Sequence, residues 1–189
     1  FPYTTLFRSY LRREILPTLA TTVQRNIRRG IENVSLYELG HVYLWDSNAP
    51  AIPALPGGVR PTDEQLAALD AGLPEQPDHV AGILTGLAED DGWMGGKRPV
   101  DWSDAVEAVR RIAGRIGAAI ELDQPAADDV PVQWHPGRVA RVMVGDVFTG
   151  WVGELHPRVN EALGFPAHSA AFELNLTALF ATLTGKPVR

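Results

Sequence analysis

LRREILPTLATTVQRNIRRGIENVSLYELGHVYLW, residues 11–45, joins a helical pattern to a strand pattern, and this pair decides the fold. In its first part apolar side chains recur every three to four residues, which is the spacing of one buried helix face. These side chains are Ile15, Leu16, Leu19, Ala20, Val23 and Ile27. The pattern predicts a helix over 11–29, with Pro17 in an early turn and Gly30 just past its end. Residues 34–45 are β-branched, aromatic and roughly alternating, so they predict a strand.

Strands and helices follow one another without a regular period in the rest of the chain. Gly145-Asp146 separates two apolar segments by two residues, which is the pattern of a tight hairpin. Further strands are predicted over 79–87, 118–122 and 170–175, and helices with Ser103, Pro157 and Asn175 at their starts. This mixture favours an α+β fold with a mostly antiparallel sheet flanked by helices.

A Pro/Gly-rich insertion is predicted over about 46–78, which holds six prolines and the pair Gly57-Gly58. Within it Thr62 and Gln65 have the spacing of a capping box, so a short helix is expected there. We expect this insertion to lie on the surface.

Composition limits the classes of function. The net charge is −6, which gives no overall attraction to nucleic acid or to an anionic membrane. Cysteine is absent, so disulfides, thiolate catalysis and cysteine-ligated zinc are excluded. No apolar run approaches the roughly 20 residues of a membrane span, and we expect a cytoplasmic protein without membrane contact.

Acid–base chemistry is one possible function, because His135 and His156 flank Glu154 in sequence and could converge with it in a stand-alone enzyme. The competing interpretation is structural, because both histidines precede a proline and X-Pro pairs end strands and begin turns or helices.

Free RNA binding is a second alternative, carried by an arginine-rich helix; the arginines are Arg12, Arg13, Arg28 and Arg29. The competing interpretation of these arginines is a solvated face or a subunit contact in an acidic chain. Four loop carboxylates could bind a divalent cation, although solvated loop carboxylates are far commoner. They are Asp90, Asp91, Asp128 and Asp129.

The opening stretch also resembles a family. LRREILPTLATTVQRNIRRGIENVSLYELGHVYL is similar to a segment of the beta subunit of bacterial phenylalanyl-tRNA synthetase. Further blocks of that family follow in order: HVAGILTG at 79–86, VDW at 100–102, HPGRVARV at 135–142, GWVGELHPRVNEALGF at 150–165 and FELNLTAL at 172–179. The resemblance therefore covers nearly the whole chain.

The resemblance implies a class II aminoacyl-tRNA synthetase-like core without an active site of its own. It implies that the partner is an alpha subunit and that the assembly is an alpha-two beta-two heterotetramer. It also implies that this whole assembly is an ATP-dependent ligase, which uses Mg²⁺ and contacts tRNA. No catalytic, cofactor-binding or metal residue is expected in this chain. The matching motif residues are expected to serve the subunit interface or the structure: Arg12, Leu16, Pro17, Asn26, Glu38, Gly40, His135, Pro136, Gly137, Arg138, Gly153, Glu154, His156 and Pro157.

Two arginines that class II enzymes use to hold ATP have no counterpart here. Where the resemblance places the first, the chain has Leu44, Trp45 and Asp46. Where it places the second, the chain has Glu173, Asn175 and Thr177. Without a guanidinium, nothing neutralises the triphosphate, so adenylation by this chain alone is not expected.

The first residues have a different origin in our interpretation. FPYTTLFRS, residues 1–9, can be spelled TTT CCC TAC ACG ACG CTC TTC CGA TCT, which resembles a sequencing adapter. We expect 1–9 to be translated adapter, 10–185 to be the catalytic-like core, and 186–189 to begin a linker towards an anticodon-binding domain.

Overall fold

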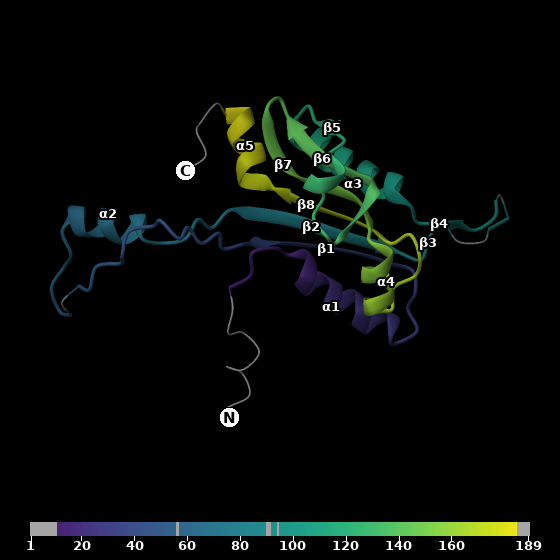
Figure 1. Cartoon of the computed structure of the whole chain (residues 1–189), viewed down its shortest axis with the longest axis horizontal. Coiled ribbons are helices and arrows are strands. Elements are labelled where there is room, and N and C mark those ends of the chain that lie inside the picture. Colours follow the sequence, from purple (N-terminus) through teal and green to yellow (C-terminus); the bar gives the residue numbers. More distant parts are fainter. Residues whose placement is uncertain (1–10, 56, 90–91, 94, 185–189) are drawn as a thin grey trace.

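The computed structural model describes residues 11–55, 57–89, 92–93 and 95–184. Six strands form one antiparallel sheet in the order β1-β2-β8-β7-β6-β5, and two short strands form a separate hairpin (Figure 1). The strands are β1 (Val34–His41), β2 (Asp78–Thr85), β3 (Leu87–Glu89), β4 (Arg98–Pro99), β5 (Glu121–Asp123), β6 (Trp134–Val144), β7 (Val147–Leu155) and β8 (Ala170–Asn175). The α+β prediction with a mostly antiparallel sheet is therefore confirmed.

Helices cover both faces of this sheet. They are α1 (Leu16–Ile27), α2 (Asp63–Ala71), α3 (Trp102–Ile116), α4 (Pro157–Leu163) and α5 (Leu176–Thr184), with a 3-10 turn at Ala127–Asp129. Helix α1 packs on β1, β2 and β8 from one side, and α3 packs on β2, β7 and β8 from the other. None of the helices in the described part of the chain is both long and apolar enough to cross a bilayer.

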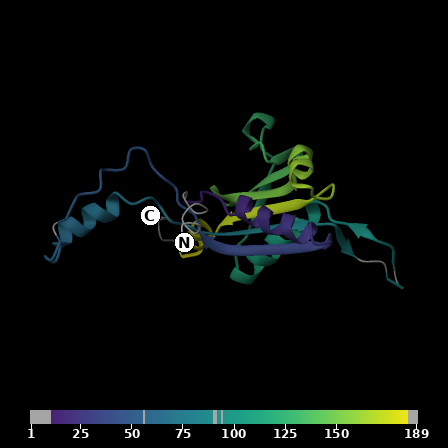
Figure 2. The ribbon, with the colours of Figure 1, turned by 90° about the horizontal axis from the view of Figure 1, so that it is seen from below.

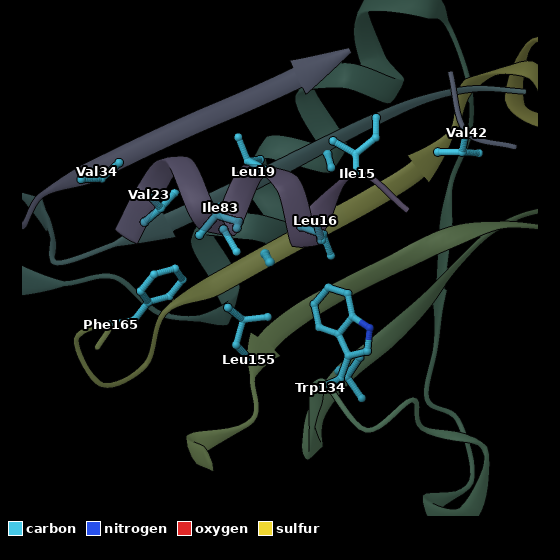
Figure 3. Packing of buried hydrophobic residues seen from close by; sticks show 14 residues of the cluster. Ile15, Leu16, Leu19, Val23, Val34, Val42, Ile83, Trp134, Leu155 and Phe165 are labelled. Carbon is cyan, nitrogen blue, oxygen red and sulfur yellow. The ribbon is translucent and has the colours of Figure 1, made fainter. Parts of the chain in front are cut away.

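Side-chain alternation along β8 assigns each residue to one of these faces. Ala170, Phe172 and Leu174 join the apolar cluster under α3, whereas Ala171 joins the cluster under α1. Figure 3 shows that second cluster, in which α1 lies across the strands with Leu16, Leu19 and Val23 inserted. Because alternation has a period of two, Glu173 lies on the α1 face with Ala171.

Helix α1 begins five residues later than predicted. The backbone N–H of Tyr43 donates to the carbonyl of Arg12 at 2.8 Å, so the chain before α1 runs beside the segment after β1 instead of coiling. Strand β1 also ends early, at His41, because the N–H of Leu44 donates to the backbone carbonyl of Glu75 at 2.9 Å. The prediction of a strand to Trp45 was wrong at its end for this reason.

The predicted cap of α3 was wrong by two residues. Asp101 is the N-cap, and its carboxylate accepts the N–H of Ser103 at 2.7 Å. The Asp104 carboxylate in turn accepts the N–H of Asp101 at 2.9 Å, which completes a capping box. Arg98 holds Asp104 through two bonds of 3.0 and 2.7 Å.

The strand predicted over 118–122 lies instead at Glu121–Asp123, as β5, whereas the turn and the caps of α4 and α5 are confirmed. Val144 pairs with Val147 across Gly145-Asp146, and Gly145 has the positive φ of 56° that such a turn requires. Pro157 opens α4, and Gly164 ends it in the left-handed conformation. Asn175 caps α5 by accepting the N–H of Ala178 at 2.8 Å.

The insertion forms an arm that extends away from the sheet (Figures 1 and 2). Its two limbs pair at the base, where the N–H of Val42 donates to Pro77 at 3.1 Å. Helix α2 lies within the arm and starts with the predicted capping box of Thr62 and Gln65. The expected adapter at 1–9, the linker at 186–189 and Asp90 and Asp91 lie outside the described residues.

Candidate functional site

A cavity of about 330 Å³ lies on the α1 face of the sheet, between the start of α1 and strands β2, β7 and β8. Its lining includes Arg13, Glu14, His79, Trp134, Trp151 and Glu173. This cavity is the candidate site, because it gathers the largest set of titratable and aromatic side chains around one space.

Glu173 joins α1 to the sheet at this cavity. Helix α1 has no side-chain cap of its own at Ile15. Instead the Glu173 carboxylate accepts the N–H of Ile15 at 2.9 Å and the N–H of Leu16 at 3.0 Å. These are N–H groups of the first turn that the helix itself cannot satisfy, and a negative charge is favourable there. Glu173 therefore acts as an N-cap supplied from a strand far away in the sequence.

His79 extends this network across the neighbouring strand. Its Nδ1 lies 2.9 Å from Oε1 of Glu173, and both side chains are largely buried. Its Nε2 is buried and has no hydrogen-bond partner among the described residues. The side-chain hydrogen bonds that the structure shows for this pair therefore go to α1 or join the two side chains to each other.

Glu14 adds a second carboxylate to the cavity. Burial raises the pKa of the Glu14 carboxyl above its ordinary value, and the negative charge of Glu173 raises it further. Two carboxylates in one cavity oppose a polyanionic ligand such as a triphosphate. Leu44 lines the same cavity; it is one of the three residues that stand where the resemblance leads us to expect an arginine and its acidic partner.

Arg12, Glu38 and Gly40 form one ion-paired unit beside this site. The guanidinium of Arg12 contacts the Glu38 carboxylate, and its Nε donates to the carbonyl of His41 at 3.0 Å. A Cβ on Gly40 would overlap the guanidinium of Arg12, so the glycine leaves room for Arg12 in its present position. The three motif residues together fix the segment before α1 against β1.

The other predicted residues of α1 have separate places. Leu16 is buried in the cluster under the helix, and Pro17 lies in the first turn. Asn26 closes the last turns, because its carbonyl accepts the N–H of Ile31 at 3.1 Å. These three residues serve the helix itself.

The two His-Pro motifs close local turns in the same way. The Nδ1 of His135 accepts the N–H of Gly137, and the Nδ1 of His156 accepts the N–H of Arg158, each at 3.1 Å. Pro136 lies at a register shift in β6, and Pro157 is the first residue of α4. The structural interpretation of both motifs therefore has direct support in the geometry.

Glu154 is buried and ion-paired. Nη1 of Arg138 donates to its Oε2 at 2.6 Å, and Nδ1 of His168 lies 3.2 Å from the same oxygen. His135 and Glu154 line one cavity of about 310 Å³, but His156 is not part of its lining. The structure thus brings together only part of the proposed acid–base set.

Gly153 explains a further motif position. A Cβ there would overlap the carbonyl oxygen of Arg138 and lie 2.6 Å from the Cα of Val139. Strands β6 and β7 approach each other closely at this point, which requires a residue without a side chain.

Sequence reasoning missed the structural roles of His79 and Glu173. Glu173 was noted only as a residue standing where an arginine was expected, and its partners lie in a different part of the sequence. The position of an acidic residue inside the apolar run FELNLTAL was the available signal, because buried charges are nearly always paired. No group of three metal-ligating side chains is present among the residues that the structure describes.

Comparisons with known proteins agree with the resemblance. A family model described as "Phenylalanyl tRNA synthetase beta chain CLM domain" matches residues 4–176. The chain is 98% identical over 182 residues to a phenylalanine–tRNA ligase beta subunit of Bifidobacterium longum, covering 96% of this chain and 21% of that protein. It is 46% identical over 172 residues to the corresponding subunit of Mycolicibacterium paratuberculosis, covering 91% of this chain and 20% of the relative. The chain thus spans about a fifth of the length of these relatives.

A solved structure supports the fold. A pyrrolysyl tRNA synthetase of Desulfitobacterium hafniense superimposes with a TM-score of 0.58 at 12% identity, covering 93% of this chain and 50% of that one. This likeness confirms the class II synthetase-like fold. Because the family model matches most of its length, the chain belongs to the family of the phenylalanyl-tRNA synthetase beta chain CLM domain.

Proposed function

We propose that this chain is a non-catalytic structural module of phenylalanine–tRNA ligase, the enzyme that attaches phenylalanine to its tRNA using ATP. One observation carries the proposal: the cavity on the α1 face holds the carboxylates of Glu14 and Glu173, and Glu173 is committed to capping α1. Arg13 also lines this cavity, but it shares the lining with these two carboxylates, whereas a class II enzyme would need a surplus of cationic groups there to hold a triphosphate. In this proposal the cytoplasmic holoenzyme, not this module, binds ATP and Mg²⁺.

The partner that we propose is the alpha subunit of an alpha-two beta-two heterotetramer, and the contact is the unit of α1 and β1. Among the described residues, strand β1 is at the edge of the sheet and pairs only with β2. On its face away from α1 it exposes Tyr37 (72%) and Leu39 (60%). An open strand edge beside exposed large apolar side chains is typical of an interface.

Neither alternative function gains comparable support. For acid–base chemistry, the Nδ1 atoms of His135 and His156 are each occupied by a local backbone N–H. For free RNA binding, Arg12 is ion-paired with Glu38 and is not available as a free cation. In our proposal tRNA contacts are made by the holoenzyme.

The test combines assembly with activity. The double change Tyr37→Asp and Leu39→Asp, made in a full-length beta chain containing this module, is expected to prevent co-purification with the alpha subunit. Val132→Asp is the matched control, because Val132 is 90% exposed and lies just before β6, which β2, β8 and β7 separate from β1 in the sheet. ATP–pyrophosphate exchange should follow complex formation and be absent from the beta chain alone. Exchange catalysed by this module without an alpha subunit would overturn the proposal.

A further inference from the structure

The arm, defined here as residues 46–77, is supported by very little of the protein. Its base is held by backbone bonds such as that from Leu44 to Glu75, and its limbs meet where Gly72 packs against Ile52. Beyond that base it extends clear of the sheet in both overall views (Figures 1 and 2). The rest of the described chain therefore does not account for its conformation.

Helix α2 in particular lacks a packing partner in the part of the chain that the structure describes. It has nine residues, and none of them is buried. Isolated helices shorter than about 12–15 residues are marginal in water, because most helical stability in proteins comes from packing. The capping box of Thr62 and Gln65 contributes only about 1 kcal/mol. Contact with a second surface is therefore needed for the helical conformation of this segment to be well populated.

The arm also exposes apolar side chains that a solvated loop would not need. Four large aliphatic residues in its described part are exposed: Ile52, Val59, Leu66 and Leu73. Trp45, at the base, is exposed as well. An elongated segment with this much accessible apolar surface is expected to be covered in the functional assembly.

Charge indicates what covers it. The arm carries five acidic residues and one arginine, a net charge of −4 out of −6 for the whole chain. The acidic residues are Asp46, Asp63, Glu64, Asp70 and Glu75. Phosphate backbones would be repelled by this charge, and so would the arm of a second copy. A basic protein surface with apolar patches would be complementary to it.

We propose that the arm is a docking element for a basic surface on another protein chain of the assembly, with α2 stabilised by that contact. This goes beyond the proposed function, because the surface is separate from the β1 edge. The contact combines burial of the exposed aliphatic side chains with ion pairs from the acidic residues of α2.

The test uses the purified ligase of Bifidobacterium longum, whose beta chain is 98% identical over this region. Hydrogen exchange of residues 63–71 is compared between the complex and the full-length beta chain alone. We expect at least tenfold slower exchange in the complex and loss of that protection in 0.5 M salt. A zero-length carbodiimide cross-linker should join Asp63, Glu64 or Asp70 to lysines of another chain.

A charge reversal supplies the matched comparison. Asp70→Lys should return the exchange of α2 to the rate of the free beta chain, whereas Asp128→Lys, an exposed acidic residue outside the arm, should not. The inference would be overturned if residues 63–71 exchanged at the same rate in the complex and in the free beta chain. It would also be overturned if these residues were already fully protected in the free beta chain. Protection that requires added tRNA would identify nucleic acid as the occupant and also overturn it. If the complex did not form, the proposed β1 interface would be contradicted. The arm is tested separately, in complexes that do assemble.

Discussion

Replacing Glu173 by alanine tests the central structural claim, that this side chain anchors α1. The change leaves the N–H groups of Ile15 and Leu16, both buried, without an acceptor. Each unsatisfied buried donor costs about 1–3 kcal/mol. Water can enter from the adjacent cavity and recover part of this loss, so we expect a decrease of about 2–4 kcal/mol in the free energy of unfolding.

Glu173→Gln separates charge from geometry. Glutamine keeps one carbonyl oxygen for the helix but loses the charge, so about 1–2 kcal/mol should be lost. Urea unfolding measures both values; with a slope of about 2 kcal/mol per molar, the alanine variant should shift the midpoint by about 1–2 M. Amide exchange at Ile15 and Leu16 should accelerate more than exchange in α3.

Glu121→Gln is the control, because Glu121 is exposed on the edge strand β5. It should leave the unfolding free energy within about 0.5 kcal/mol of the original. If Glu173→Ala behaved like this control, and exchange at the start of α1 were unchanged, the carboxylate would not be the cap of α1 and the reasoning would fail.

Of three further substitutions, two should stabilise the protein and one should destabilise it. Glu14→Gln should stabilise the protein at pH 7, because the folded state raises the pKa of Glu14 and so loses stability as pH rises above the ordinary value of 4.5. Thermal melts should show this gain shrinking towards pH 4; a gain independent of pH would contradict it. Gly153→Ala should destabilise by about 1–3 kcal/mol, because its Cβ would overlap the backbone of β6. Gly114→Ala, in α3 with open space around it, should instead stabilise by about 0.5–1 kcal/mol in the same urea titration.

Turns and helix caps that depend on neighbouring residues could be predicted from the sequence. The Gly145-Asp146 turn, the capping box at Thr62 and the start of α4 at Pro157 each depend on neighbours within four positions. The sheet class followed from the mixture of these elements. Errors occurred where a distant segment competed, as when Tyr43 paired with Arg12 and delayed the start of α1.

The candidate site was less predictable for the same reason. Arg12, Glu38 and Gly40 were named from the resemblance, but their shared role is visible only when β1 lies beside the segment before α1. His79 and Glu173 are 94 residues apart, and no local pattern links them. The arm was predicted as an insertion from its prolines, but its lack of packing is a property of the assembled sheet.

The bond from Ile15 to Glu173 also has a consequence for synthesis on the ribosome, because it spans 158 residues. At about 5–20 residues per second, the start of α1 waits roughly 8–30 s for the strand that completes it. During that interval the nascent helix lacks the part of its cover that β8 supplies, and its first N–H groups are open to water. A chaperone that binds the emerging chain would therefore find a target in residues 11–30, and would be displaced when β8 arrives.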